Sequence, residues 1–561
     1  MRIKRTLVCL GAMALLVGSQ QAMADANPEG ALPAVEKAQP SRDPAVKLDT
    51  RQEVDERLRK LLATRIHVKR FDIIGAKTIP SAEIDAITKP YLDGVHTVQD
   101  YMNLASDITK LYRDRGYPLS FAYIPAQTFA NHEVKIEVIE GFVGKLVMEG
   151  DFGNSEQRIR EIVRPLLEER PLRAATLERV TGLLRLVQGL GLQAYLPLPK
   201  TRDGSAILTV KATRQAISAV GRFESLRPKT RAIVSVQTNS HGPAAEQARF
   251  TTLLSEDSEE YYAASYSQLL GSSGLRLNVE GSFYTGDSDD EDYPAGLARD
   301  VMSLRLSTSL SYPFIADRYQ TLTGSVGINA INYEDRIRNT ETLRSLTSKT
   351  NSRALVLAAD YTLMHPDKSL GLQLALSKGI DSIGASKSVR TNFPVTGLGE
   401  NPADLDFEKV NIGATLRNAW PWRLGTAVSM VGQYSPDYVP VVERVQFGGY
   451  QFGRAFRPGF IYGDSGWGAS AEVNRLIPAS LDLSYFQLVG VQPYLLAEMA
   501  RTYQKVRVTD IDRIKSLALG VRLKTDVLGV LDMAIAKALD NRRDSNKDDL
   551  TFSFNFGFML N

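Results

Sequence analysis

From Gln215 to the C-terminus the chain alternates between apolar and polar side chains, and this pattern restricts the fold more than any other feature of the 561-residue sequence. In the last segment Phe552, Phe554, Phe556 and Phe558 are separated by single small or polar residues. Such a strand has one apolar and one polar face, and about ten residues suffice for a tilted strand to cross a membrane. Because a soluble β-sandwich alternates in the same way, the pattern leaves two fold classes open.

The lengths of the connections favour the membrane barrel. We predict sixteen strands, near residues 216, 232, 247, 262, 275, 302, 320, 352, 369, 407, 425, 468, 488, 516, 528 and 551. The long connections follow odd-numbered strands, at residues 287–299, 335–349, 381–406, 436–467, 504–515 and 540–549. Those after even-numbered strands are mostly short, such as 313–318, 365–368, 421–423 and 525–527. Long external loops with short periplasmic turns are typical of an outer-membrane barrel and have no reason to occur in a sandwich. We therefore expect a transmembrane antiparallel β-barrel over residues 213–561.

The N-terminal segment 1–24 has the layout of a cleaved secretory signal. Three basic residues precede an apolar stretch over residues 7–17, and Ala22, Met23 and Ala24 follow. No later segment has the 18 or more uninterrupted apolar residues that a membrane helix requires. The sequence therefore predicts an exported protein without membrane helices.

Composition excludes several kinds of chemistry. The one cysteine, Cys9, lies in the predicted signal, so the mature chain has no disulfide and no thiol chemistry. The five histidines are scattered singly, so we expect no metal site and no cofactor. The acidic residues within 287–292 fit either a solvated loop or a Ca²⁺ site. The net charge of +3 gives no reason to expect nucleic acid as a partner.

Residues 25–65 are expected to form a linker with one short amphipathic helix. Four prolines lie among small and charged residues before position 48. Thr50 and Glu53 then form a capping box, and Val54, Leu58 and Leu61 mark one apolar face. This helix could either pack on the next domain or plug a pore.

Two copies of one small α/β module follow, over residues 66–140 and 141–212. In the first, we predict strands at 66–74, 119–124 and 134–139, with helices at 81–91 and 97–115. The second begins with a strand from residue 142 and repeats the order, with helices at 155–167 and 176–188 and strands at 193–198 and 206–212. The sequence therefore predicts a tandem repeat of α+β modules in front of the barrel.

Residues 447–467 match neither a strand nor a helix. The segment contains six glycines, six Phe or Tyr residues and two arginines. Glycines at this density allow sharp bends and close backbone contacts, whereas a solvent loop does not need so many aromatic side chains. We predict that the loop 436–467 folds into the barrel, with Arg454 at its tip.

Short motifs in both regions resemble a known family. They are Arg115-Gly116-Tyr117 before Ile124-Pro125-Ala126-Gln127, then Phe447-Gly448-Gly449, Gly453-Arg454-Ala455-Phe456 and Gly463-Asp464-Ser465-Gly466-Trp467. With the signal, the helix, the paired modules and the barrel, they resemble the TpsB transporters of two-partner secretion, in the BamA-like superfamily. The resemblance covers nearly the whole mature chain, and it identifies the modules as POTRA (polypeptide-transport-associated) domains.

The resemblance implies roles for particular residues. Arg454 stands at the arginine of the family's Val-Arg-Gly-Tyr/Phe tetrad and would contact an acid on a barrel strand, here Glu498 within Leu496-Ala497-Glu498-Met499-Ala500. Gly453, Ala455 and Glu498 depart from the family pattern. The loop would be supported by Gly448, Gly449, Gly463, Asp464 and Gly466. An exposed edge with Leu119, Phe121 and Tyr123 on one face would bind an extended peptide, although these side chains could also simply pack under the second helix.

The implied function is passage of a large unfolded partner exoprotein, of adhesin or haemolysin type, across the outer membrane of a Gram-negative bacterium without nucleotide hydrolysis. The POTRA domains would lie in the periplasm, the barrel would contact outer-membrane lipids, and the barrel-assembly machinery would recognise Phe558 and its neighbours. An outer-membrane protein insertase of the same superfamily is the alternative. A passive porin leaves the modules unexplained, and a serine protease at Ser465 lacks a nearby histidine.

Overall fold

A computed structural model describes residues 62–128, 132–226, 229–255, 259–288, 296–393, 400–483, 486–505, 512–525, 529–539 and 550–560. The predicted signal, most of the linker with its helix, and most of the acidic segment 287–292 lie outside these residues. No helix in the part of the chain so described is long and apolar enough to cross a membrane.

The first module packs two helices against a small sheet. Its elements are β1 (Arg65–His67), β2 (Arg70–Ile74), α2 (Ser81–Thr88), η2 (Lys89–Tyr91), β3 (Val95–Thr97), α3 (Val98–Asp114), β4 (Phe121–Tyr123) and β5 (Glu133–Ile139). The sheet has the order β2-β5-β4, with β2 parallel to β5 and β4 antiparallel to it. The expected first strand at 66–74 is divided in two, because β1 pairs with β3 in a separate sheet.

The longest helix of this module, α3, follows from its sequence. Thr97 and Asp100 form a capping box that fixes the start of the helix. Residues at helical spacing then form one buried face, which includes Tyr101, Leu104, Ile108 and Tyr112.

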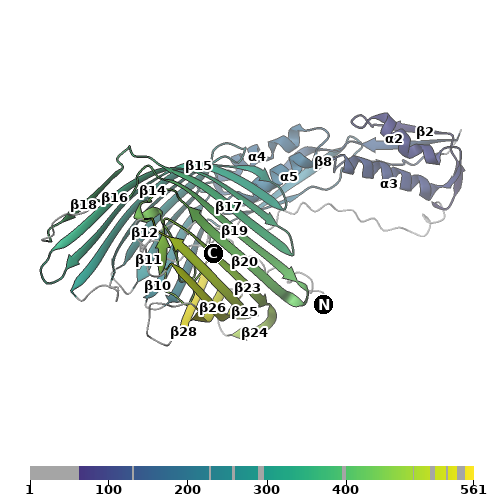
Figure 1. Cartoon of the computed structure of the whole chain (residues 1–561). Helices are drawn as coiled ribbons and strands as arrows, with labels where there is room; N and C mark the ends of the chain where they lie inside the picture. Colours follow the sequence, from purple (N-terminus) through teal and green to yellow (C-terminus); the bar gives the residue numbers. More distant parts are fainter. Residues whose placement is uncertain are drawn as a thin grey trace.

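The second module repeats this topology. It contains β6 (Phe142–Gly150), η4 (Gly153–Ser155), α4 (Glu156–Glu168), α5 (Ala174–Arg185), β7 (Leu190–Tyr195) and β8 (Ser205–Arg214). Its sheet has the order β6-β8-β7, with β6 parallel to β8 and β7 antiparallel to it, as in the first module. In Figure 1 the two modules lie one beyond the other, and α4, α5 and β8 are next to the barrel.

The remaining strands close into an antiparallel barrel. They are β9 (Ile217–Leu226), β10 (Lys229–Asn239), β11 (Gln247–Ser255), β12 (Glu260–Leu269), β13 (Arg276–Ser288), β14 (Leu297–Ala316), β15 (Gln320–Asn339), β16 (Ser345–Met364), β17 (Lys368–Gly379), β18 (Ser386–Thr391), β19 (Glu408–Trp420), β20 (Leu424–Tyr434), β23 (Ser465–Arg475), β24 (Ile477–Leu483), β25 (Phe486–Tyr503), β26 (Arg513–Thr525), β27 (Val530–Ala538) and β28 (Leu550–Leu560). β17 and β18 form one staggered strand beside β16, and β23 and β24 form one beside β25, so sixteen strands make the wall. β28 pairs with β9 and closes it. The predicted fold class and strand number are confirmed.

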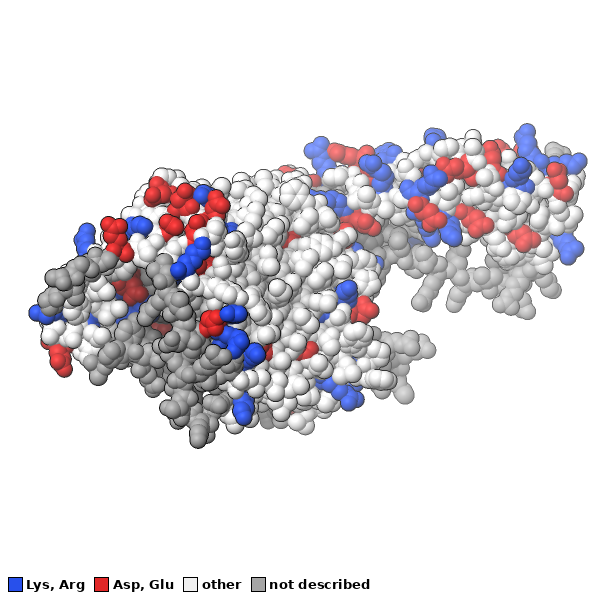
Figure 2. Space-filling view, in the orientation of Figure 1, with Lys and Arg blue, Asp and Glu red and all other residues white. Residues whose placement is uncertain are grey.

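The two faces of the wall differ as the alternation predicts. On β14, Leu304 and Leu306 are about half exposed on the outer face, whereas the side chain of Ser303 is fully buried inside. Figure 2 shows a wide band with few charges over the barrel, between charged residues at its far end and those on the modules. The uncharged band is the part of the wall that suits a membrane.

Four strands extend further toward the external side than predicted. One is β18, which lies within the expected loop at 381–406 and pairs with β16. β14, β15 and β16 each have 20 residues and continue into the expected loops at 287–299 and 335–349. Here cross-strand ion pairs join Arg299 to Asp335 at 2.7 Å and Lys349 to Glu334 at 2.7 Å. Charged residues that alternate with apolar ones can therefore belong to a strand, because paired charges stabilise a sheet in water.

Candidate functional site inside the barrel

The connection between β20 and β23 folds into the barrel. It contains a short helix, η6 (Val441–Glu443), and two strands, β21 (Val445–Phe447) and β22 (Ile461–Gly463), which pair as an antiparallel hairpin. The hairpin side chains of Val445, Phe447, Phe456 and Ile461 form one cluster with inward residues of the wall, including Ile514. The loop is therefore a packed part of the barrel interior.

The beginning of the loop contacts β13, β14 and β15. Val442 packs among four buried residues of these strands, Tyr284, Val301, Ile331 and Tyr333. Next to it, the ammonium of Lys409 on β19 donates to the carboxylate of Glu443, and both side chains are almost fully buried. The loop thus contacts this part of the wall as well as β25 to β28, where its tip lies.

Asp464 ties the two ends of the loop together. This fully buried carboxylate accepts the backbone N–H of Val439 at 3.2 Å and that of Lys505 at 3.0 Å. The Nε atom of Arg444 lies 3.3 Å from its Oδ1 atom. A buried carboxylate needs such donors, because burial without them is strongly unfavourable.

Arg454 lies at the tip, where the sequence predicts it. Its Nη1 atom donates to the hydroxyl of Tyr494 on β25 and lies 3.6 Å from Asp532 Oδ2 on β27. The guanidinium also lies over the ring of Tyr450, 5.1 Å from its centroid, an arrangement that attracts a cation. The Arg454 side chain is 8% exposed, so these groups replace water around it.

Glu498 meets Arg454 in a way that the sequence did not predict. Its Oε2 atom accepts the backbone N–H of Arg454 at 2.7 Å and the hydroxyl of Ser516 at 2.8 Å. The structure thus brings the two predicted residues together, but through the backbone of Arg454. The acid that lies beside the guanidinium is Asp532.

A second arginine extends this network along the wall. Arg522 on β26 makes a bidentate pair with Glu472 on β23, at 2.7 and 2.6 Å, and its Nε atom lies 3.5 Å from Asp532. Its guanidinium lies over the ring of Tyr494, 4.1 Å from the centroid. Asp532 therefore lies between two arginines, one from the loop and one from the wall.

The glycines of the segment are explained by close contacts. At Gly448 the backbone has φ of +128°, and a Cβ atom would lie 2.2 Å from the carbonyl oxygen of Arg457. At Gly453 a Cβ atom would lie 2.6 Å from the side chain of Ile514. Gly463 and Gly466 likewise approach the backbone of β25. Gly449 has φ of +65°, which favours glycine.

The tip also contacts the last strand. The hydroxyl of Tyr450 donates to the carbonyl oxygen of Phe554 at 3.2 Å. On β28, the hydroxyl of Thr551 donates to the carbonyl oxygen of Ala455 at 3.0 Å. Phe456 is buried beside Phe460. The loop therefore reaches β28, which forms the closing seam with β9.

The predicted peptide-binding edge is smaller than expected. Leu119 precedes β4 and is fully buried in the core of the second module, so it cannot belong to an exposed edge. At Ala122 the backbone N–H donates to the hydroxyl of Thr109 on α3, at 2.9 Å. Only Phe121 and Tyr123 remain partly exposed on β4, with ring centroids 6.1 Å apart.

Four residues of this network are not predicted from the sequence: Tyr494, Asp532, Arg522 and Glu472. Each of them can be recognised in the sequence as a polar or charged residue on a strand that crosses the membrane. Identifying them as neighbours requires the register, in which Arg522 lies directly opposite Asp532.

Comparisons with known proteins agree with this architecture. The model of the ShlB-type POTRA domain matches residues 66–141, and that of the haemolysin secretion/activation proteins ShlB/FhaC/HecB matches residues 252–523. The outer membrane transporter CdiB of Escherichia coli O6:K15:H31 (strain 536 / UPEC) is 23% identical over 417 residues, which cover 71% of this chain and 67% of the relative.

Solved structures show the same fold. CdiB from Escherichia coli superimposes with a TM-score of 0.66 at 16% identity, covering 93% of this chain and 94% of the other. CdiB from Acinetobacter baumannii gives 0.57 at 13% identity, covering 93% and 95%. The two matched ranges together cover more than half of the sequence. The chain therefore belongs to the ShlB/FhaC/HecB family, the TpsB transporters of two-partner secretion, whose barrel lies in the outer membrane with the POTRA domains in the periplasm.

Proposed function

We propose that this transporter secretes one large, unfolded exoprotein of adhesin or haemolysin type through its barrel, without nucleotide hydrolysis. The observation that carries the proposal is the loop, which contacts β13 to β15 through Val442 and β25 to β28 through its tip. A polypeptide crossing the barrel would have to displace it.

The contacts of the loop suit displacement. Its polar contacts with the wall are hydrogen bonds and ion pairs, such as those of Glu443 and Arg454. Such contacts form and break without covalent chemistry. Arriving cargo could replace them by offering its own backbone groups to the same wall residues. Water in the lumen would also solvate the separated charges and lower the free energy needed to part them.

We further propose that Phe121 and Tyr123 contact the N-terminal segment of the exoprotein in the periplasm. Both rings are partly exposed and lie side by side. Strand addition next to Ala122 is disfavoured, because Thr109 already accepts its N–H. The peptide would therefore lie across the two rings.

We propose no catalytic step for Ser465. Its hydroxyl accepts the backbone N–H of Ser435 at 3.0 Å, which gives it a structural role at the base of the loop. His365 lies in the short turn between β16 and β17, beside Asp367, at the other end of the barrel.

For biogenesis, we propose that the barrel-assembly machinery recognises β28 around Phe558.

A secretion assay tests the function. We expect deletion of the gene to remove one large secreted protein from the medium and to leave the outer-membrane protein profile intact. Arg454→Ala should lower secretion while the barrel still assembles, whereas Arg475→Ala, at an exposed arginine at the end of β23, should not. Broad loss of other barrels would instead identify an insertase, and normal secretion by Arg454→Ala would remove Arg454 from the mechanism.

A further inference from the structure

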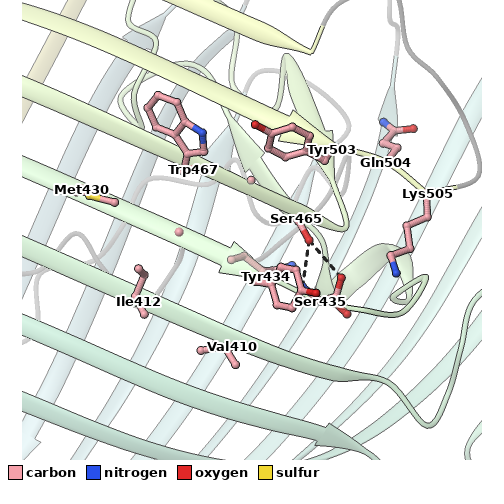
Figure 3. A pocket seen from close by; sticks show the side chains of 13 residues that line it. Val410, Ile412, Met430, Tyr434, Ser435, Ser465, Trp467, Tyr503, Gln504 and Lys505 are labelled. Atoms are coloured by element: carbon pink, nitrogen blue, oxygen red, sulfur yellow. Dashed lines mark hydrogen bonds between the residues drawn. The ribbon is translucent and has the colours of Figure 1, made fainter.

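A crevice of about 590 Å³ opens on the wall near the base of the loop (Figure 3). It is lined by residues of β19, β20, β23 and β25 and of the following connection, among them Ile412, Met430, Tyr434, Trp467, Tyr503 and Lys505. This volume lies in the range of roughly 300–1,000 Å³ that is usual for small-molecule sites.

The crevice lies on the outer face. On β20, Gln433 points inward, since its amide donates to the loop carbonyls of Glu443 and Asp464. Its neighbours Gly432 and Tyr434 therefore point outward, and Tyr434 is largely exposed. Gly432 contributes no side chain at an outward position, which leaves a gap between Met430 and Tyr434 in a face that otherwise contacts lipid.

The crevice is near the external rim. β20 ends at Tyr434 and β23 begins at Ser465, where the loop leaves and rejoins the wall, and β25 ends close by at Tyr503. The second POTRA module lies at the opposite rim, where Arg179 donates to the carbonyl of Pro313. Tyr and Trp are enriched where a membrane meets water, so the crevice lies at the level of the outer leaflet.

The chemistry of the lining indicates the occupant. The lining is apolar at Ile412, Met430 and Trp467, whereas the exposed Lys505 follows β25 at one side of the crevice (Figure 3). An acyl chain fits the walls, and an anionic head group complements the ammonium. We propose that the crevice binds an acyl chain of a phosphate-bearing outer-leaflet lipid, with the phosphate at Lys505.

The same residues connect the crevice to the loop. Ser435 and Ser465 line the crevice and bond to each other across the two ends of the loop. Gln504, another lining residue, donates to the carbonyl of Tyr462 at 2.9 Å. A lipid in the crevice would therefore lie against the segment that anchors the loop. The proposal depends on the membrane position of the barrel and not on the nature of the cargo.

Tryptophan fluorescence tests this site directly. The chain has three tryptophans, and Trp420 and Trp422 lie at the turn between β19 and β20, at the other rim. In the full chain carrying Trp420→Phe and Trp422→Phe, the emission therefore reports on Trp467. The protein is placed in phosphatidylcholine vesicles with a small fraction of lipid brominated on its acyl chains, either phosphatidic acid or phosphatidylcholine.

At equal fractions, we expect brominated phosphatidic acid to associate with the site about five-fold more strongly than brominated phosphatidylcholine, the factor for one lysine at an anionic surface. Lys505→Gln should remove this difference, and Gly432→Leu should reduce quenching by both lipids because it fills the crevice. Thr308→Leu is the matched control, because it also enlarges an outward-facing side chain, but on β14, away from the crevice. This variant should change neither the quenching by the two lipids nor the difference between them. Equal quenching by the two lipids would overturn the proposal. So would protection of Trp467 from both lipids in a sedimenting dimer, which would make the crevice an interface between two copies.

Discussion

At the scale of single residues, the backbone and the guanidinium of Arg454 contact different side chains. Glu498 accepts the backbone N–H, and Tyr494 and Asp532 contact the guanidinium. A side-chain substitution at position 454 removes the second set of contacts and leaves the first in place. Substitution of the Arg454 side chain should therefore remove the contact with Asp532 and keep the hydrogen bond to Glu498.

Double-mutant cycles distinguish these contacts. We expect Arg454→Ala and Asp532→Asn to be coupled by about 1–3 kcal/mol in the free energy of unfolding, as for residues within one charge network. Arg454→Ala and Glu498→Gln should be nearly additive, because the backbone N–H remains and glutamine still offers an acceptor. Urea unfolding of the barrel in vesicles measures both cycles. Stronger coupling to position 498 than to 532 would show that the guanidinium interacts with Glu498 instead.

At the scale of elements, Glu140 fastens the end of β5 to the rest of the first POTRA domain. Its carboxylate accepts the backbone N–H groups of Lys77 and Thr78 at 2.8 and 2.6 Å, the hydroxyl of Thr78 at 2.9 Å and that of Tyr112 at 2.9 Å. Burial raises the pKa of this carboxyl, but the four hydrogen bonds together outweigh burial and hold the pKa below its ordinary value.

This arrangement predicts a pH dependence. Because the folded pKa lies below the unfolded value, the stabilisation is complete above the unfolded pKa of about 4.3 and is lost as the pH falls through the folded value. We expect the amides of Lys77 and Thr78 to lose protection from hydrogen exchange in that acidic window. Glu140→Gln should cost about 1–3 kcal/mol at neutral pH and flatten the dependence. An unchanged acid profile in this variant would show that another group is responsible.

Elements differ in how well the sequence specifies them. The limits of α3 were predicted to within one residue, because a capping box and a regular apolar face define them locally. β4 is three residues long instead of the expected six, because its extent depends on pairing with β5 and on contacts with α3. Strand pairing involves distant residues, which local patterns do not identify.

At the scale of the whole molecule, the second POTRA domain and the barrel share one core. Ala245, Leu269 and Ala316 of the barrel belong to the buried cluster of that domain. Arg276 on β13 donates to the carbonyl of Leu186 at the end of α5, at 2.9 Å. The orientation of this domain is therefore fixed by packing and capping.

At Gly182 the helix α5 lies very close to the barrel. A Cβ atom there would lie 2.0 Å from the backbone oxygen of Ala316, so we expect Gly182→Leu to separate α5 from the barrel. Overpacking of about 1–3 kcal/mol should make the amides of α5 exchange about five-fold faster or more, and secretion should fall while the barrel assembles. Ala175→Leu, on the exposed side of the same helix, is the matched control. Equal exchange rates in both variants would contradict a tight joint.

The sequence by itself determined the barrel, its sixteen strands, the tandem modules and the inward loop, because alternation, connection lengths and glycine content are local properties of the chain. Only the tertiary structure decided that Arg454 pairs with Asp532 while its backbone meets Glu498, that Leu119 is buried, and that a glycine opens a crevice near the outer rim. These facts depend on the register between strands and on side-chain packing across the lumen. A sequence pattern shows which face a residue occupies, but not which distant residue lies opposite it.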